Sequence, residues 1–180
     1  MKVIGISGSP RIGGNSEILL DQVLKGAKDN GADISKYILD NMDIAPCHAC
    51  EECAKGIDCK NNDECNELLD EVLACDAIVF ASPIYYGQMS AQGKLFTDRF
   101  FSISKNENKS FEGTKAILVF AHGAPTGAYE QYIELTKASP FSYTGFDVKD
   151  VIVAGDIHDV GEVKNNSEIM DKAYESGKNL

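Results

Sequence analysis

Five short apolar runs, separated by amphipathic helical patterns or longer connections, constrain the fold of this chain more than any other feature. The runs cover residues 3–7, 34–39, 77–81, 114–121 and 148–154. Helical spacing of apolar residues predicts helices at about 16–27, 63–75, 90–101 and 129–137, and from 167 onward. Near-continuous apolar strands that alternate with helices are typical of a parallel sheet covered on both faces. The sequence therefore predicts an α/β fold with a doubly wound, five-stranded parallel sheet and helices on both faces.

Length and charge narrow the class of protein further. At 180 residues the chain suits one domain over 1–180. No apolar run approaches the roughly 18 residues needed to span a bilayer. The first run is too short for the apolar region of a secretory signal and is followed by a glycine turn. We therefore expect a cytoplasmic protein. A net charge of -11 disfavours nucleic acid and anionic membranes as partners. We interpret the basic residues between 94 and 115 as a solvated face rather than a docking patch: Lys94, Arg99, Lys105, Lys109 and Lys115.

The connection after the first run has the composition of a phosphate-binding loop. Glycines at 8, 13 and 14 let backbone N–H groups converge at the start of a helix, whose N-terminus favours anions. The loop lacks the Lys-Ser/Thr of a nucleotide-hydrolysing P-loop and the G-x-G-x-x-G of a dinucleotide site. A terminal monophosphate such as that of FMN remains, the alternative being a glycine-rich turn without a ligand. The predicted contacts are Ser7, Ser9, Arg11, Asn15 and Ser16.

Two further connections follow strand ends, where ligands bind in doubly wound sheets. The loop after the third run offers two adjacent aromatic side chains that could cover a flat ring, or it is simply a packed turn. Its candidate residues are Pro83, Ile84, Tyr85, Tyr86 and Gly87. After the fourth run, His122 and Gly123 begin a small, glycine-rich loop that could approach the ring edge. Taken alone, His122 is more often a loop histidine that has no role.

Taken together, these loops resemble the flavodoxin-like NADPH-dependent FMN reductase superfamily. The resemblance covers nearly the whole chain and keeps the order of the motifs. It implies a flavodoxin-like fold, with the FMN phosphate on the first loop and its ring against 83–87 and the loop after His122. The segments that carry the resemblance are Gly8-Ser9-Pro10-Arg11 with Gly14-Asn15-Ser16, Ser82-Pro83-Ile84-Tyr85-Tyr86-Gly87, Ala91-Gln92-Gly93-Lys94 and Asp98-Arg99.

Four cysteines form a separate feature in an irregular stretch at about 41–62. Cys47, Cys50, Cys53 and Cys59 follow the pattern C-x2-C-x2-C-x5-C. Two-residue spacers let one turn of chain present thiolates to the corners of a [4Fe–4S] cluster. Structural zinc usually takes two separated knuckles, so zinc is the weaker alternative, and a loop without metal is another. Cys65 and Cys75 fall on the apolar stripe of a predicted helix and are interpreted as core residues.

With the cysteine motif included, the chain resembles the iron–sulfur flavoprotein family. That resemblance implies one FMN and one [4Fe–4S] cluster per subunit, a homodimer or homotetramer, and electrons from a ferredoxin-like donor. One departure from the family pattern leaves Cys65 open as a ligand in place of Cys59, because Asp63-Glu64-Cys65 stands where relatives carry an acidic pair and methionine.

We therefore hypothesise a flavin-dependent oxidoreductase that passes electrons from the donor through the cluster to FMN and on to a small-molecule acceptor. No side chain is predicted as a general acid or base, since the redox chemistry belongs to the cofactors. The first alternative is a cluster-free NAD(P)H-dependent FMN or quinone reductase. A passive electron carrier and a zinc-binding regulatory module are the others.

Overall fold

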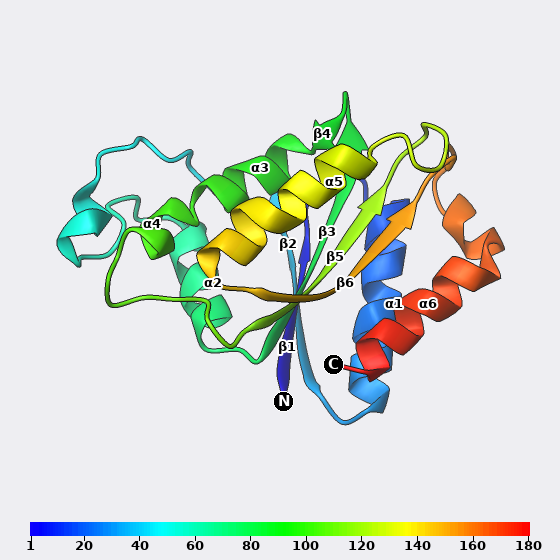
Figure 1. Ribbon diagram of the computed structural model, residues 1–180, viewed down its shortest axis with the longest axis horizontal. Coiled ribbons are helices and arrows are strands. Elements are labelled where there is room, and N and C mark those ends of the chain that lie inside the picture. The colour runs from blue at the N-terminus through cyan, green and yellow to red at the C-terminus, as the bar shows by residue number, and fades with distance from the viewer.

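The computed structural model describes residues 1–180 and is built around one twisted parallel sheet (Figure 1). The parallel strands are β1 (Lys2–Ser7), β2 (Asp33–Ile38), β3 (Ala77–Tyr85), β5 (Lys115–Ala121) and β6 (Asp147–Ala154). Their spatial order, β2-β1-β3-β5-β6, is the 2-1-3-4-5 order of flavodoxin-like sheets. The predicted α/β fold with a five-stranded, doubly wound parallel sheet is confirmed.

The helices cover both faces of this sheet. Helices α1 (Asn15–Asp29) and α6 (Ser167–Lys178) pack on one face in Figure 1. The other face carries α2 (Glu64–Leu73), α3 (Ala91–Asp98), α4 (Phe101–Ser104) and α5 (Glu130–Thr136). None of these helices combines the length and the apolar character required to cross a membrane.

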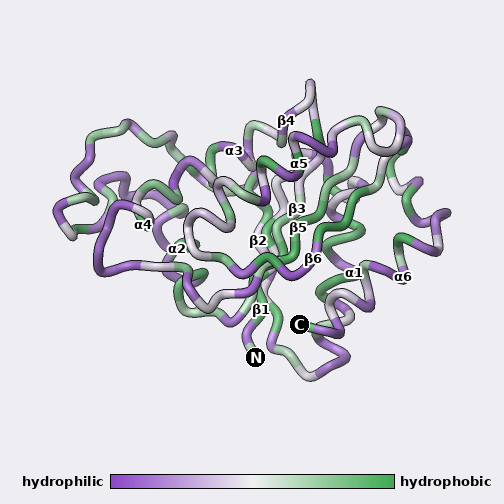
Figure 2. The backbone as a smooth tube through the Cα atoms, in the orientation of Figure 1, coloured by the Kyte–Doolittle hydropathy of each residue, from purple (hydrophilic) through white to green (hydrophobic).

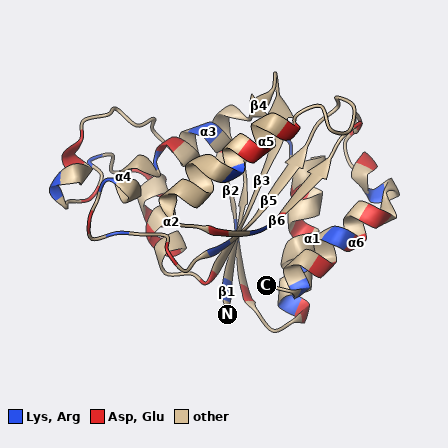
Figure 3. Ribbon diagram, viewed as in Figure 1, with Lys and Arg blue, Asp and Glu red and all other residues tan.

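Alternating side chains divide the interior into two cores. On β3, Ala77, Val79 and Ala81 face the core beneath α1 and α6, whereas Ile78 and Phe80 face the opposite core. Seven of the eight phenylalanines belong to this second core, and the first core is entirely aliphatic. The hydrophobic colour in Figure 2 is accordingly concentrated in the central strands, and Figure 3 shows charged residues mostly on helices, loops and strand ends. The aromatic core is the one that lies under the cysteine-rich stretch.

Two local features differ from the sequence prediction. Strand β3 continues through Ser82 to Tyr85, where a loop was expected, and a two-residue strand β4 (Gln88–Met89) returns antiparallel to it. The residues between them form a tight hairpin in which Tyr86 and Gly87 both have positive φ. The apolar run itself covers only residues 77–81, but β3 stays paired with β5 as far as Pro83, which lies opposite Ala121. A proline can occupy such a position although it cannot donate a hydrogen bond to the ladder.

The helix expected at 90–101 is divided. Helix α3 ends at Asp98, and the one-turn helix α4 begins at Phe101. Ser90 caps the start of α3 by accepting a hydrogen bond from Gly93 N at 3.1 Å. At the other end, Phe96 and Phe100 are buried on either side of the break, so the aromatic core fixes where the chain turns.

Candidate functional site

The carboxyl ends of four strands surround an open cleft, which is where a doubly wound sheet binds ligands. Helix α1 begins at its edge, and the loops after β5 and β6 close its far side. Nine of the twelve predicted FMN contacts line this cleft: Ser9, Arg11, Asn15, Ser16, Pro83, Ile84, Tyr85, His122 and Gly123. The three loops chosen from the sequence therefore do lie together.

The remaining three predicted residues lie around the cleft rather than on its wall. Ser7 is fully buried, and its Oγ accepts the Ser9 N–H at 3.4 Å, so it supports the loop from beneath. Tyr86 and Gly87 form the β3–β4 turn, and the Tyr86 side chain is fully exposed. Tyr85, about two-fifths exposed, is the aromatic residue that the structure turns toward the cleft.

The first loop is held in shape by its own polar groups. Ser9 Oγ accepts the Arg11 N–H at 3.1 Å, and the Arg11 carbonyl accepts the Gly14 N–H at 3.1 Å. Gly13 has a φ of +69°, which favours glycine, and its N–H donates to Glu17 Oε2 at 2.7 Å. The first-turn N–H groups of α1 have no intrahelical acceptors and point toward the cleft end of the helix. Arg11 is exposed beside them, so the loop combines backbone donors with one exposed cation.

Asn15 has a different role from the one the sequence suggested. Its Nδ2 donates to the Asp159 carbonyl at 2.8 Å, and its Oδ1 accepts the Val163 N–H at 3.2 Å. The side chain thus ties the first loop to the connection after β6. It lines the cleft, but both of its polar atoms already have protein partners.

His122 is buried just after the end of β5, and its backbone N–H donates to the Ala154 carbonyl. Its Nδ1 lies 3.0 Å from the Ala124 carbonyl, and its ring meets Tyr129 edge-on with centroids 4.9 Å apart. Its Nε2 is buried without a hydrogen-bond partner in the protein. A buried polar atom without a partner is costly, so at this cleft wall His122 Nε2 is available to hydrogen-bond a bound ligand.

The cleft also contains residues that the sequence analysis missed. Ile157, His158 and Val160, from the connection after β6, line it opposite the first loop. His158 approaches closely, since a Cβ added at Gly123 would lie 3.0 Å from its Nδ1. The rule that ligands sit beyond strand ends applies equally to the fifth strand, so the same argument could have found this wall.

The cysteine-rich stretch lies at the opposite end of α3 from the cleft (Figure 1). It contains one short helical turn, Glu52–Lys55, and its non-glycine residues Ala49 and Glu51 have positive φ. Contacts with the aromatic-core side hold it: Asn106 Nδ2 donates to the Ile57 carbonyl at 3.2 Å, and Lys109 pairs with Asp58 at 2.8 Å. Tertiary contacts, rather than regular structure, thus determine its path.

The structure brings all four predicted ligands to one small hollow. Cys47, Cys50, Cys53 and Cys59 line it together with Arg99 and Phe101. Burial raises the pKa of the Cys53 thiol, and the neighbouring Cys59 and Cys47 add to that effect. No three or more His, Cys, Asp or Glu side chains converge closely enough to be recognised as a metal site. The donor set is collected in one place, and its thiols are free.

Cys65 does not belong to this hollow. It is completely buried on α2 in the aromatic core, and burial raises the pKa of its thiol to about 12. Cys75 is likewise a core residue, with a pKa raised to about 11 by burial. Their interpretation as core residues is confirmed, and the structure favours Cys59 over Cys65 at the hollow.

The basic stretch at 94–115 is less uniform than expected. Arg99 has no exposed surface and forms an ion pair with Asp63 at 2.6 Å. Lys94 and Lys109 also have acidic partners, at Asp98 and at Asp58. The interpretation as a solvated face was therefore wrong for Arg99, because charged residues are usually exposed and the sequence does not reveal the buried partner Asp63.

Comparisons with known proteins agree with this architecture. Residues 1–156 match the family model of the NADPH-dependent FMN reductases. An iron–sulfur flavoprotein of Archaeoglobus fulgidus is 30% identical over 98% of this chain and 80% of its own length. Another, from Methanosarcina thermophila, is 32% identical over 74% of this chain and 70% of its own.

Solved structures show the same fold at low sequence identity. An NAD(P)H:quinone oxidoreductase from Methanothermobacter marburgensis superposes with a TM-score of 0.75 at 17% identity, covering 100% of this chain and 96% of its own. An FMN-dependent NADH-azoreductase from Bacillus anthracis, solved with FMN, gives 0.72 at 16%, covering 100% and 99%. The chain belongs to the iron–sulfur flavoprotein family within the flavodoxin-like NADPH-dependent FMN reductases, and it is a flavin-dependent oxidoreductase.

Proposed function

We propose that this protein passes electrons from a ferredoxin-like donor, through a [4Fe–4S] cluster held by its cysteine loop, to FMN and on to a small-molecule acceptor. The observation that carries the proposal is the presence of two donor sets in one fold. The first loop, which has the composition of a phosphate-binding loop, lines one cleft, and four thiols line a hollow at the far end of α3. Each set suits one of the two cofactors.

The cleft fits FMN by the chemistry of its walls. Ser9, Arg11 and Ser16 offer donors beside the N-terminus of α1, which suits a phosphate dianion. Ile84 and Tyr85 offer an apolar wall for a flat ring, and His122 Nε2 offers a buried polar atom without a partner. Asn15 holds two walls of the cleft together rather than donating to the phosphate.

The cysteine loop fits a cluster by composition and neighbourhood. Four free thiols share one hollow, and Cys50, its most accessible thiol, faces solvent. Binding would require the thiols to draw together and lose their protons, which is the usual coupling of metal binding to local folding. Bound cofactors would supply the redox chemistry: one-electron transfer at iron, and one- or two-electron transfer at the flavin.

Helix α3 provides a direct structural link between the two sites. Its N-cap, Ser90, donates to the Gly8 carbonyl of the first loop, and Arg99 at its other end contacts Cys59. With a rise of 1.5 Å per residue, Ser90 and Arg99 are about 13 to 14 Å apart along the helix axis. An electron donor that docks beside the cysteine loop would therefore lie only one short helix away from the flavin cleft.

An anaerobic absorption spectrum with iron and sulfide assays on the same freshly purified sample tests this proposal. We expect flavin bands on a broad iron–sulfur shoulder, with about four irons and four sulfides per chain. Reduced ferredoxin should then bleach the flavin faster than NADPH does. Flavin without iron or sulfide, even after anaerobic reconstitution, would reject the cluster.

A cluster-free NAD(P)H-dependent FMN or quinone reductase is the second candidate. It is supported by the match of residues 1–156 to the family model of the NADPH-dependent FMN reductases. Rapid bleaching of the flavin by NADPH alone, in iron-free protein, would select it over the relay. We also propose a homodimer or homotetramer, which sedimentation of the FMN-loaded protein tests directly.

A further inference from the structure

Arg99 is the one arginine that the fold buries completely, and it lies where the cysteine loop meets the body of the protein. It follows the last residue of α3 and stands between the buried Phe96 and Phe100, so its backbone is fixed by the aromatic core. A fully buried cation is costly unless it is paired and hydrogen-bonded. Its position therefore calls for a specific reason.

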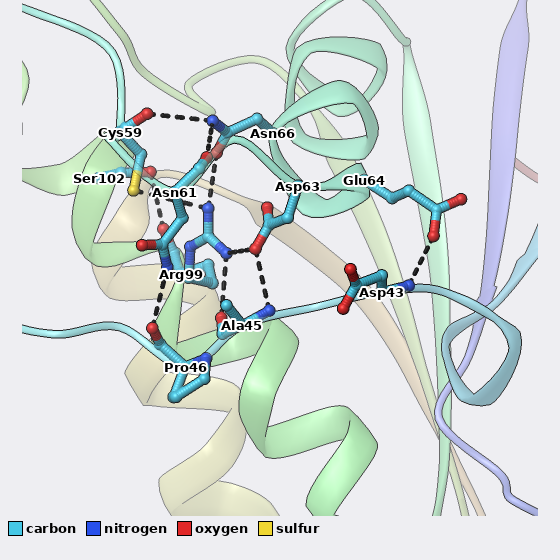
Figure 4. Close-up of polar contacts among 10 residues, drawn as sticks. All are labelled: Asp43, Ala45, Pro46, Cys59, Asn61, Asp63, Glu64, Asn66, Arg99 and Ser102. Carbon is cyan, nitrogen blue, oxygen red and sulfur yellow. Dashed lines mark hydrogen bonds and ion pairs between the residues drawn. The ribbon is translucent and has the colours of Figure 1, made fainter.

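The guanidinium connects the two ends of the cysteine loop (Figure 4). Nη1 donates to the Ala45 carbonyl at 3.0 Å and to Asp63 Oδ2 at 2.6 Å, and Asp63 Oδ2 also accepts the Ala45 N–H. Nη2 donates to Asn66 Oδ1 at 2.6 Å. Ala45 precedes the first cysteine, and Asp63 and Asn66 follow the fourth, so one side chain closes the loop at its base.

Asn66 extends this closure to Cys59 itself. Its Nδ2 donates to the Cys59 carbonyl at 3.1 Å and to the Asn61 carbonyl. Asn61 Nδ2 in turn donates to the Pro46 carbonyl at 2.9 Å. Asn66 thus holds the backbone around the fourth cysteine by hydrogen bonds, and Arg99 orients the Asn66 side chain.

The remaining Nη2 hydrogen points at sulfur. Arg99 Nη2 lies 3.5 Å from Cys59 Sγ, within hydrogen-bonding range for a sulfur acceptor. An arginine side chain stays protonated in proteins, so this cation is permanent. Arg99 Nε and Asp63 Oδ1 are both buried without a hydrogen-bond partner, so this ion pair keeps unused hydrogen-bonding capacity.

We propose that Arg99 is the positioning residue of the cysteine loop: it joins the loop's two ends and supplies a hydrogen-bonded positive charge to Cys59 Sγ. The second part rests on the cluster of the proposed function. Hydrogen bonds to cluster sulfurs and nearby charge set the reduction potential of a cluster. A cation beside one thiolate favours the reduced form, which carries one more negative charge, so Arg99 raises the potential.

The test compares Arg99→Gln and Arg99→Lys with Lys94→Gln, which removes a positive charge from the exposed side of the same helix. Two quantities are measured: the midpoint potential of the anaerobically reconstituted cluster, and the amide hydrogen exchange of residues 47–62 in metal-free protein. Arg99→Gln should lower the potential. It should also speed exchange in the loop at least about tenfold, because it breaks charged hydrogen bonds.

Arg99→Lys separates the two roles and protects the test if Arg99→Gln folds poorly. Lysine keeps the charge but cannot reach both ends of the loop, so we expect a smaller loss of potential with fast loop exchange. Lys94→Gln should change neither quantity. A wild-type potential in both Arg99 variants would overturn the charge role, and wild-type loop exchange in both would overturn the closing role.

Failure of the proposed cluster would be recognised separately. Wild-type protein that takes up no iron and sulfide on reconstitution rejects the cluster and with it the effect on potential. Loop exchange in the metal-free protein would still decide whether Arg99 closes the loop.

Discussion

The flavin cleft and the cysteine loop are built in opposite ways. The cleft consists of strand ends and a helix N-terminus, whose positions follow from the sheet, and its loops are short and internally hydrogen-bonded. The cysteine loop has a single helical turn and two non-glycine residues with positive φ. It is closed by side chains that come from α2 and from the end of α3.

This difference predicts which site is ordered before its ligand arrives. A cleft whose walls belong to a sheet keeps its shape whenever the sheet is folded. A loop held by a few polar contacts opens at a much smaller free-energy cost than the whole domain. Metal binding would then supply part of the loop's order, as in other sites where binding and local folding are coupled.

The largest effect is expected from Cys50→Ser. Cys50 is exposed, so its replacement should leave the fold and the flavin intact while iron and sulfide fall to near zero. Cys75→Ala is the matched control, because it removes a core cysteine outside the loop. Iron, sulfide and FMN are assayed in the same samples. Parallel loss of FMN in Cys50→Ser would show that the two sites are not built independently.

Thiol labelling of metal-free native protein sharpens the same contrast. Burial raises the pKa of Cys65 to about 12, so at pH 8 only about one such thiol in ten thousand is ionised. Because the thiolate is the reactive form, Cys65 and Cys75 should resist alkylation until the protein unfolds. Cys50 should react first, and mass spectrometry of peptides identifies each site. Early labelling of Cys65 would contradict its assignment to the core.

The same contrast explains how much could be predicted from the sequence. Alternating apolar runs and helical patterns predicted the parallel strands of the sheet and most helices. Three of the loops at its edge followed from topology alone. The β3–β4 hairpin was missed because Pro83 and Gly87 favour a loop after the apolar run. The wall around His158 was missed because only three strand ends were considered.

The surroundings of the cysteine loop could not be predicted in this way. Spacing identified four thiols, but nothing in sequence places Arg99 beneath them, since Arg99 is 40 residues from Cys59 and resembles its solvent-exposed neighbours. Likewise, the amide of Asn15 was available for a phosphate in sequence terms, yet the fold uses it to hold the connection after β6. Long-range polar contacts of this kind depend on packing details that local patterns do not encode.

A smaller effect, confined to the cleft, is expected from Arg11→Gln. The exposed guanidinium can pair with a phosphate dianion, and such charged hydrogen bonds contribute about 1.5–3 kcal/mol. FMN should therefore bind about ten- to a hundredfold more weakly, measured by quenching of FMN fluorescence on titration. Lys28→Gln, at the exposed far end of α1, should bind FMN normally. The iron content of Arg11→Gln should stay at the wild-type value, and a loss of iron would show that the two sites are not independent.

The smallest effect is expected at Ser90, which tests whether α3 couples the two regions. Ser90 is buried, caps α3 by accepting Gly93 N–H, accepts from Ser82 Oγ at 3.3 Å, and donates to the Gly8 carbonyl. Ser90→Ala removes the cap and should lower the free energy of unfolding by about 1–2 kcal/mol, or a few degrees in Tm for a chain of this size. Ser104→Ala, at an exposed site at the end of α4, should leave the Tm unchanged.

If α3 acts as one rigid element, Ser90→Ala should weaken FMN binding slightly and also speed exchange in the cysteine loop. Exchange at the wild-type rate, with weaker FMN binding, would mean that the helix transmits nothing and that the two sites share only a scaffold.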